Sequence, residues 1–136
     1  FDGALSDYSK AIDLNPKDAK SFNNRGLIKM EIGDYQGAAD DYIKATEVNP
    51  NHANAFLNLC YVQQKHLNDN YGAIFNCTKS LGIYPDRSNA YKNRGDAKKN
   101  IGDIKGACAD WRRASDLGYE NEDEDEDIKE NIRDEC

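Results

Sequence analysis

The 136-residue sequence lacks the signatures of catalytic and cofactor chemistry. It contains no glycine-rich phosphate loop, no His-Glu-x-x-His zinc motif and no Gly-x-Ser-x-Gly nucleophile motif. The two histidines, His52 and His66, are expected at helix ends, and no pair of cysteines or histidines has the spacing of zinc ligands. We therefore predict that the protein is not an enzyme and holds no metal or cofactor.

Long apolar runs and clustered positive charges are also missing. No run approaches the roughly 18 apolar residues of a membrane span, and no signal peptide is visible. The formal net charge is −7, and residues 120–136 alone carry ten acidic and two basic side chains, so residues 1–119 carry +1. Nucleic-acid binding would need a basic stripe. We therefore predict neither nucleic acid binding nor a membrane span.

The spacing of the four cysteines gives little support for disulfides, because no Cys-x-x-Cys motif is present. Cys60 and Cys77 stand where a small or apolar side chain is expected, so we predict that they are reduced and packed in the core. A bond between Cys108 and Cys136 stays open as an alternative. It would tie the C-terminal segment to the residues before it and would need an oxidising compartment.

What the sequence does contain is a repeat of 34 or 35 residues, visible in four sets of positions. Intervals of 34, 35 and 34 residues separate Ala4, Ala38, Ala73 and Ala107. The same intervals separate Tyr8, Tyr42, Cys77 and Trp111, and also Ala11, Ala45, Ser80 and Ala114. The fourth set is Pro16, Pro50 and Pro85. Such a period indicates stacked helical units, and an elongated stack tolerates the low hydrophobic share of 38%.

The small and large side chains of the repeat follow an order that resembles the tetratricopeptide repeat (TPR), with Phe22, Arg25, Gly26, Ala38, Tyr42, Ala45 and Pro50 in its first full copy. The resemblance implies an all-α fold, a right-handed α-α superhelix or solenoid of antiparallel helix pairs. It implies three full units, 19–52, 53–87 and 88–119, preceded by the second helix of a truncated unit, 1–18. A cytoplasmic location is favoured, while a periplasmic or secreted one stays open because the N-terminus looks truncated.

Two places depart from the regular repeat. The second unit has one extra residue, which we expect in the turn His66–Asn70, since Asn and Asp tolerate turn conformations. Residues 120–127 include seven acidic side chains, and such runs are usually solvated. After them, Ile128 and Ile132 share one helical face, which predicts a capping helix over 123–134 within the C-terminal segment 120–136. It is similar to the short terminal helix, ending in Cys, that follows a Gly-Ala-Cys-x-Asp-Trp last repeat in some bacterial-type TPR proteins.

The resemblance implies that function lies on a surface. In TPR arrays the first helix of each unit lines a concave groove. The matching positions here predict a peptide-binding groove formed by Lys20, Asn23, Asn24, Leu27, Asn54, Leu57, Asn58, Tyr61, Gln64, Asn89, Lys92, Asn93 and Lys99. Three amides at one equivalent position can donate to and accept from the backbone of an extended peptide: Asn24, Asn58 and Asn93. Apolar groups in a groove also indicate an interaction site, here Leu27, Leu57 and Tyr61.

We therefore predict a scaffold or adaptor that binds an extended peptide or a partner helix of unknown identity. TPR arrays that clamp the C-terminal carboxylate of chaperones need lysine, arginine and asparagine at set positions. Only Asn58 matches among the residues that stand there, so this ligand is not predicted: Asn23, Leu27, Asn58, Asn89 and Asn93. Two alternatives stay open. The chain could self-associate through residues 1–14, whose helix lacks a partner helix, or its acidic tail could fold over the lysines of the groove and compete with the ligand.

Overall fold

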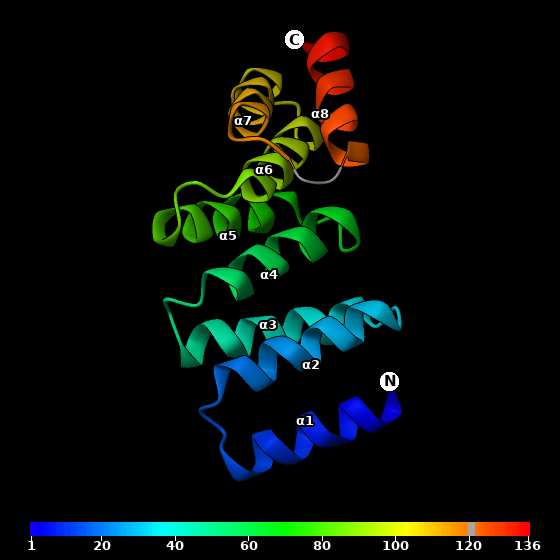
Figure 1. Ribbon diagram of the computed structural model, residues 1–136, viewed down its shortest axis with the longest axis vertical. Coiled ribbons are helices and arrows are strands. Elements are labelled where there is room, and N and C mark those ends of the chain that lie inside the picture. Colours follow the sequence, from blue (N-terminus) through cyan, green and yellow to red (C-terminus); the bar gives the residue numbers. More distant parts are fainter. Residues whose placement is uncertain (120–121) are drawn as a thin grey trace.

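The computed structural model describes residues 1–119 and 122–136, and this part of the chain folds into eight helices without a strand (Figure 1). The helices follow one another along a single elongated stack, from the N-terminus at one end to α8 at the other (Figure 1). Their bounds are α1 Asp2–Leu14, α2 Ala19–Glu31, α3 Tyr35–Val48, α4 Ala53–Lys65, α5 Asn70–Ile83, α6 Ser88–Asn100, α7 Ile104–Leu117 and α8 Glu122–Glu135. The predicted all-α solenoid is confirmed.

The helices pack in pairs, and the pairs define an inner side of the stack. The closest packing joins α2 with α3, α4 with α5, and α6 with α7, while α1 packs on α2 and α8 on α7. The first helices of successive pairs also contact one another, α2 with α4 and α4 with α6, whereas no comparable contact links the second helices α3, α5 and α7. Helices that approach each other lie on the inside of a curve. The first helices therefore line the concave side.

The starts and ends of the helices follow from local sequence. The carboxylates of Asp34, Asp69 and Asp103 each accept a hydrogen bond from the backbone N–H three residues later, which satisfies a donor that the helix leaves free. In the turns before α3 and α7, Gly33 and Gly102 have φ near +85°, a left-handed conformation that glycine adopts without steric cost. Between α4 and α5 the turn is one residue longer, 66–69, and Asn68 takes the left-handed position with φ +51°.

Two of the helix pairs close through a glycine against an aromatic ring. A Cβ atom on Gly26 would lie 2.5 Å from Tyr42, and one on Gly95 would lie 2.7 Å from Trp111, so only glycine allows these helices their close approach. Both rings are almost completely buried. The core of each pair therefore depends on matching the smallest residue with a very large one.

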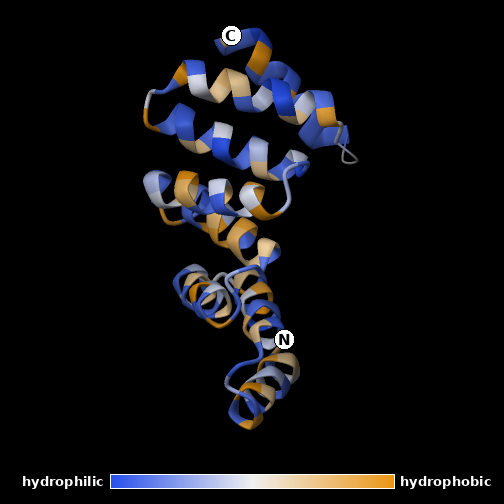
Figure 2. Cartoon of the chain, turned by 90° about the vertical axis from the view of Figure 1, so that its left-hand side faces the viewer, coloured by the Kyte–Doolittle hydropathy of each residue, from blue (hydrophilic) through white to orange (hydrophobic). Residues whose placement is uncertain are grey.

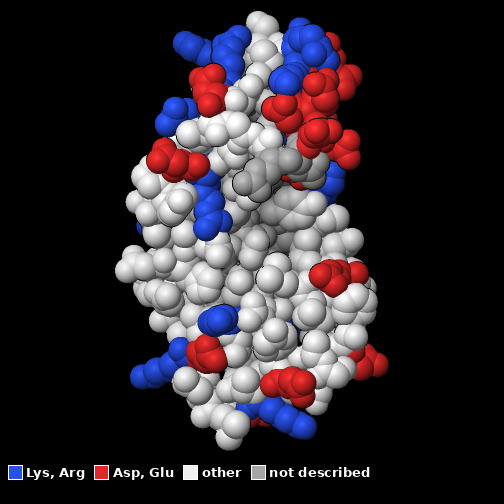
Figure 3. Space-filling model, viewed as in Figure 1, with Lys and Arg blue, Asp and Glu red and all other residues white. Residues whose placement is uncertain are grey.

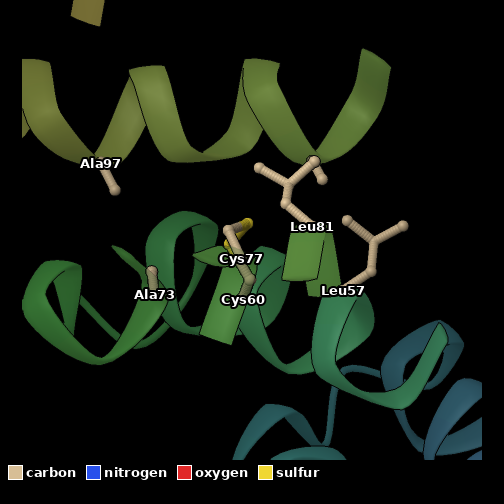
Figure 4. Packing of buried hydrophobic residues seen from close by; sticks show 7 residues of the cluster. Leu57, Cys60, Ala73, Cys77, Leu81 and Ala97 are labelled. Atoms are coloured by element: carbon tan, nitrogen blue, oxygen red, sulfur yellow. A yellow bond between two sulfur atoms is a disulfide. The ribbon is translucent and has the colours of Figure 1, made fainter. Parts of the chain in front are cut away.

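The pair α4–α5 is closed by a disulfide in place of a glycine and an aromatic ring, and here our prediction of reduced cysteines was wrong. Cys60 stands where the other pairs have glycine and Cys77 where they have the aromatic ring, and the two form a disulfide with a Cα–Cα distance of 5.4 Å (Figure 4). Both are fully buried. The spacing of 17 residues does not suggest a bond in the sequence. The folding of the two helices against each other brings the side chains together.

A second disulfide, Cys108–Cys136, joins α7 to the C-terminus, as the alternative in the sequence analysis allowed. It holds α8 against α7, where Ile128 is fully buried in a cluster with Ala107 and Trp111. The predicted helix therefore exists and is longer than expected, covering Glu122–Glu135.

The helix α8 keeps the period of the repeat, which the sequence analysis missed. Asp127 follows Asn93 by 34 residues, so it continues the ladder Asn24, Asn58 and Asn93. By the same interval Lys129 stands where α6 has Gly95, and it pairs with Asp125 at 2.7 Å. The α8 helix thus occupies the place of another first helix. It carries charged side chains where a partner helix would pack, so this face of α8 is suited to contact with water.

Candidate functional site

The candidate site is the inner surface, by which we mean the side chains of α2, α4, α6 and α8 on the concave side of the stack. The thirteen residues predicted from the sequence all lie on α2, α4 and α6. The structure sorts them by burial. Five are exposed: Lys20, Leu27, Asn54, Tyr61 and Asn89. Five are partly buried: Asn24, Asn58, Gln64, Lys92 and Lys99. Three are buried: Asn23, Leu57 and Asn93.

Asn23, a buried member of the predicted set, has a role within the stack. The side-chain amide of Asn58 donates a hydrogen bond to Oδ1 of Asn23 at 3.0 Å, which ties α4 to α2. This bond occupies one of the two donors of Asn58 and leaves its carbonyl oxygen for other partners. A substitution at Asn58 would therefore change both helix packing and any ligand contact, and Asn24 is the better test position.

The apolar part of the inner surface lies on α2 and α4. Leu27 is 40% exposed and Tyr61 38%, an unusual degree for large apolar side chains that share one face. Beside them the ring of His66 stacks on Tyr35 with centroids 3.7 Å apart, and Tyr61 meets His66 edge-on. The stacking fixes the position of His66, and the edge contact supports Tyr61 on one side.

Lys92 of α6 is already paired with acids. Lys92 contacts Asp96 at 3.0 Å and Asp127 of α8 at 3.5 Å, and Asp96 also accepts a hydrogen bond from the indole N–H of Trp111. Burial, the largest single effect, lowers the pKa of Lys92, but the nearby carboxylates outweigh it and raise the pKa. Lys92 is therefore a charged side chain that holds α8 to α6.

The other end of α6 is neutralised in the same way, and α8 adds negative charge to the inner surface. Lys99 pairs with Glu135 at 3.1 Å. The positions of α8 that match the inner surface of the other first helices are exposed, and they are mostly acidic: Asp123, Glu126, Asp127, Glu130 and Asp134. Figure 3 shows acidic side chains gathered over α8, whereas the middle of the same face carries few charges. The inner surface thus changes from neutral and partly apolar on α2 and α4 to acidic on α8.

Buried ion pairs fix the first helices on the second ones. Arg25 donates two hydrogen bonds to Asp41, at 2.7 and 2.8 Å, and Lys29 contacts the same carboxylate at 3.0 Å. The α6–α7 pair repeats this arrangement with Arg94, Lys98 and Asp110. Hydrogen bonding to the carboxylate raises the pKa of each arginine. These bidentate contacts hold the inner surface in a defined geometry.

We expect the protein to lose stability above about pH 10. Burial raises the pKa of Tyr42 and of Tyr119, with the neighbouring acids Asp41 and Glu124 adding to it, and the pKa of Lys92 is raised as described. The folded chain keeps these protons where the unfolded chain releases them. The stabilisation is therefore complete below the unfolded pKa and falls as the pH rises towards the folded pKa, by about 1.4 kcal/mol per group and pH unit.

Urea unfolding followed by circular dichroism from neutral to strongly alkaline pH measures this loss. The variant Tyr42→Phe, which keeps the buried ring but cannot release a proton, should show a smaller decrease than the wild type. Equal unfolding free energies for the wild type at neutral pH and at pH 11, about one unit above the ordinary tyrosine pKa, would contradict the prediction.

Other features of the described residues do not form an alternative site. A cavity of about 690 Å³ lies between the turn 84–89 and residues 117–119, and Asn89 is the one member of the predicted set that lines it. The described residues contain no cluster of three or more side chains suited to hold a metal ion. None of their helices has the length and apolar character needed to cross a membrane.

One repeat of the chain matches a known family. Residues 19–52, which form α2, α3 and the turn after them, match the family model of the tetratricopeptide repeat. The chain therefore contains a tetratricopeptide repeat (TPR). No curated protein matches it.

Solved structures share this fold. The chain resembles the crystal structure of MamA with a TM-score of 0.83 and 17% identity, over 98% of this chain and 85% of that one. It resembles the TPR domain of Arabidopsis OM64 with a TM-score of 0.79 and 23% identity, over 87% and 96%. A third structure is the first TPR of Spaghetti (RPAP3) bound to the HSP90 peptide SRMEEVD, with a TM-score of 0.74 and 21% identity, over 85% and 93%. TPR domains are protein-interaction modules, and the chain has their fold.

Proposed function

We propose that the inner surface binds an extended peptide segment of a partner protein, and that this segment carries an apolar side chain followed by basic ones. The observation that carries the proposal is the gradient along the surface. Leu27 and Tyr61 are apolar groups exposed on α2 and α4, while the matching face of α8 is acidic. Complementary charge steers a partner and fixes its register.

The amides on the same helices as the apolar groups suit a peptide backbone. Asn24 and Asn54 project from successive first helices and are partly or fully exposed. Each can donate to a carbonyl and accept from an N–H group, so they contact an extended chain without reading its side chains. Selectivity then comes from the apolar groups beside the amides on α2 and α4 and from the acids on α8.

An acidic peptide fits the surface less well. The solved neighbour with SRMEEVD shows that a TPR of this fold can bind an acidic peptide. In this chain, however, Lys92 and Lys99 on α6 are paired with Asp127 and Glu135 of α8. An acidic ligand would have to break these pairs and face the remaining carboxylates. This arrangement also differs from a tail that folds over the groove, because α8 stands beside α6 in the place of a further first helix.

A random-sequence peptide display library screened on the disulfide-bonded chain tests the proposal. We expect the selected peptides to combine lysine or arginine with a leucine-like residue. The variant Asn24→Ala/Tyr61→Ala should weaken their binding by about tenfold, measured by fluorescence anisotropy, with an unchanged circular dichroism spectrum. The matched control Tyr71→Ala removes an aromatic side chain that is 74% exposed on the second helix α5, and it should leave binding unchanged.

Two results would contradict the proposed peptide-binding surface. Selected peptides that are acidic, or whose binding persists in the Asn24→Ala/Tyr61→Ala variant, would place the ligand elsewhere. Reversing the charge of Glu126 and Glu130 to lysine should shift the selected peptides from basic to acidic, because both side chains are exposed on the acidic face of α8. A selection that ignores this change would exclude α8 from the ligand surface.

The disulfides also bear on where the protein works. Such bonds persist mainly in oxidising compartments, and the described cysteines are all paired. We therefore favour the periplasmic or secreted alternative over the cytoplasmic location.

A further inference from the structure

We propose that the Cys108–Cys136 disulfide is a reducible tether for α8, and that its reduction releases α8 and thereby removes the acidic end of the inner surface. The second part rests on the proposed function, since it concerns the ligand that α8 helps to attract. The first part rests on the structure alone.

The two disulfides differ in their access to a reductant. Cys60 and Cys77 are both fully buried between α4 and α5. Cys136 is exposed just after α8 and is bonded to Cys108, which is 7% exposed. A thiolate must reach a disulfide sulfur to exchange with it, so access decides which bond reacts. A dithiol can therefore reach the terminal bond while the core bond stays closed.

Apart from the disulfide, α8 is held by a small apolar cluster and by polar contacts that are largely exposed. Among its residues Ile128 alone is fully buried, with Ile132 partly buried. Two ion pairs join it to α6, Lys92–Asp127 and Lys99–Glu135, and their acidic partners are 58% and 34% exposed. Isolated helices of this length are marginal in water. Like charges four residues apart destabilise them further, as at Glu126 and Glu130.

The exchange is a balanced two-electron reduction. One thiolate of a dithiol attacks Sγ of Cys136, the S–S bond breaks, and the Cys108 thiolate leaves and takes up a proton. The second thiol of the reductant then displaces the Cys136 thiolate, which is also protonated. The protein gains two electrons and two protons, and the dithiol becomes a disulfide.

Release of α8 changes the inner surface at one end. It frees Lys92 and Lys99 from Asp127 and Glu135 and takes the acidic side chains of α8 away from the ligand. The affinity for basic peptides should fall, while α2 and α4 keep their amides and apolar groups. The core disulfide keeps α4 and α5 together throughout.

Graded reduction of the full chain with dithiothreitol tests the tether. Alkylation and mass spectrometry should show Cys108 and Cys136 modified before Cys60 and Cys77. Hydrogen exchange should then rise roughly tenfold or more in α8 and stay unchanged in α4 and α5. Reduction of both bonds together, or a protected α8 after selective opening of the terminal bond, would overturn the tether.

Matched variants separate the tether from the ligand surface. Cys108→Ser/Cys136→Ser should raise hydrogen exchange in α8 without reductant. Glu122→Gln/Arg133→Gln, which changes exposed charges of α8 and keeps the bond, should leave this exchange unchanged. The binding probes are two fluorescein-labelled peptides of alternating leucine with lysine or with glutamate. If the disulfide-bonded chain does not prefer the lysine probe, the proposed function fails, and hydrogen exchange still decides the tether. If it prefers that probe and keeps the preference after α8 is released, the proposed control of binding is overturned.

Discussion

Replacing both Cys60 and Cys77 with alanine is expected to lower the free energy of unfolding by about 3 kcal/mol, since the bond closes a loop of 17 residues and restricts the unfolded chain. The loss of two buried sulfur atoms adds to this effect, because the site between α4 and α5 is fully enclosed. Urea unfolding of the disulfide-bonded wild type and the variant under non-reducing conditions measures the difference.

The neighbouring helix pairs supply an unusual control for this prediction. Cys60→Gly/Cys77→Tyr would install in α4–α5 the same glycine and tyrosine that close α2–α3 through Gly26 and Tyr42. We expect this variant to unfold at higher urea than the double alanine variant, since the ring fills the space that the sulfurs leave. If the double alanine variant is as stable as the wild type, or more stable than the glycine and tyrosine variant, the bond and the ring do not serve the same purpose.

Asp110→Ala is expected to destabilise the chain by about 3 kcal/mol. The carboxylate is almost fully buried. It accepts two hydrogen bonds from Arg94 and forms an ion pair with Lys98. Without it two positive charges lie close together, mostly shielded from water, and neither has a carboxylate partner. Thermal unfolding followed by circular dichroism measures the effect, and Arg94→Ala should recover part of the loss in the double variant, because it removes one of the two unpaired charges.

The pair α4–α5 again offers the matched comparison, because it lacks these charges. Asn76 stands at the position of Asp110, and it donates one neutral hydrogen bond to Gln63 at 2.8 Å. Asn76→Ala should therefore cost only about 1 kcal/mol. Similar losses at Asp110 and Asn76 would mean that the ion pairs add nothing beyond one ordinary hydrogen bond.

The two helix pairs with ion pairs and the one with a disulfide are alternative ways of holding the same geometry. Arg25 and Arg94 also donate a hydrogen bond to the preceding second helix, at Ser9 of α1 and Thr78 of α5, and so connect successive pairs. In the middle pair Leu59 takes the arginine position and is buried. The middle of the stack is thus joined by covalent and apolar contacts, and its ends by charged ones.

The sequence by itself determined the fold. The interval of 34 or 35 residues shared by alanines, aromatic residues and prolines predicts stacked helix pairs, since each set marks one recurring packing position. The longer turn before α5 was also visible, because turn conformation depends on a few neighbouring residues. The candidate surface was predicted by position alone, as the resemblance to TPR arrays supplies the positions.

The tertiary structure alone decided how those positions are used. It paired Cys60 with Cys77, buried Asn23, Leu57 and Asn93, and placed α8 beside α6 as a further first helix with an acidic face. These outcomes depend on which side chains meet across two helices. Spacing along the chain states where a residue stands in its own helix, whereas burial and pairing depend on the distance and angle between helices, which only the packed chain defines.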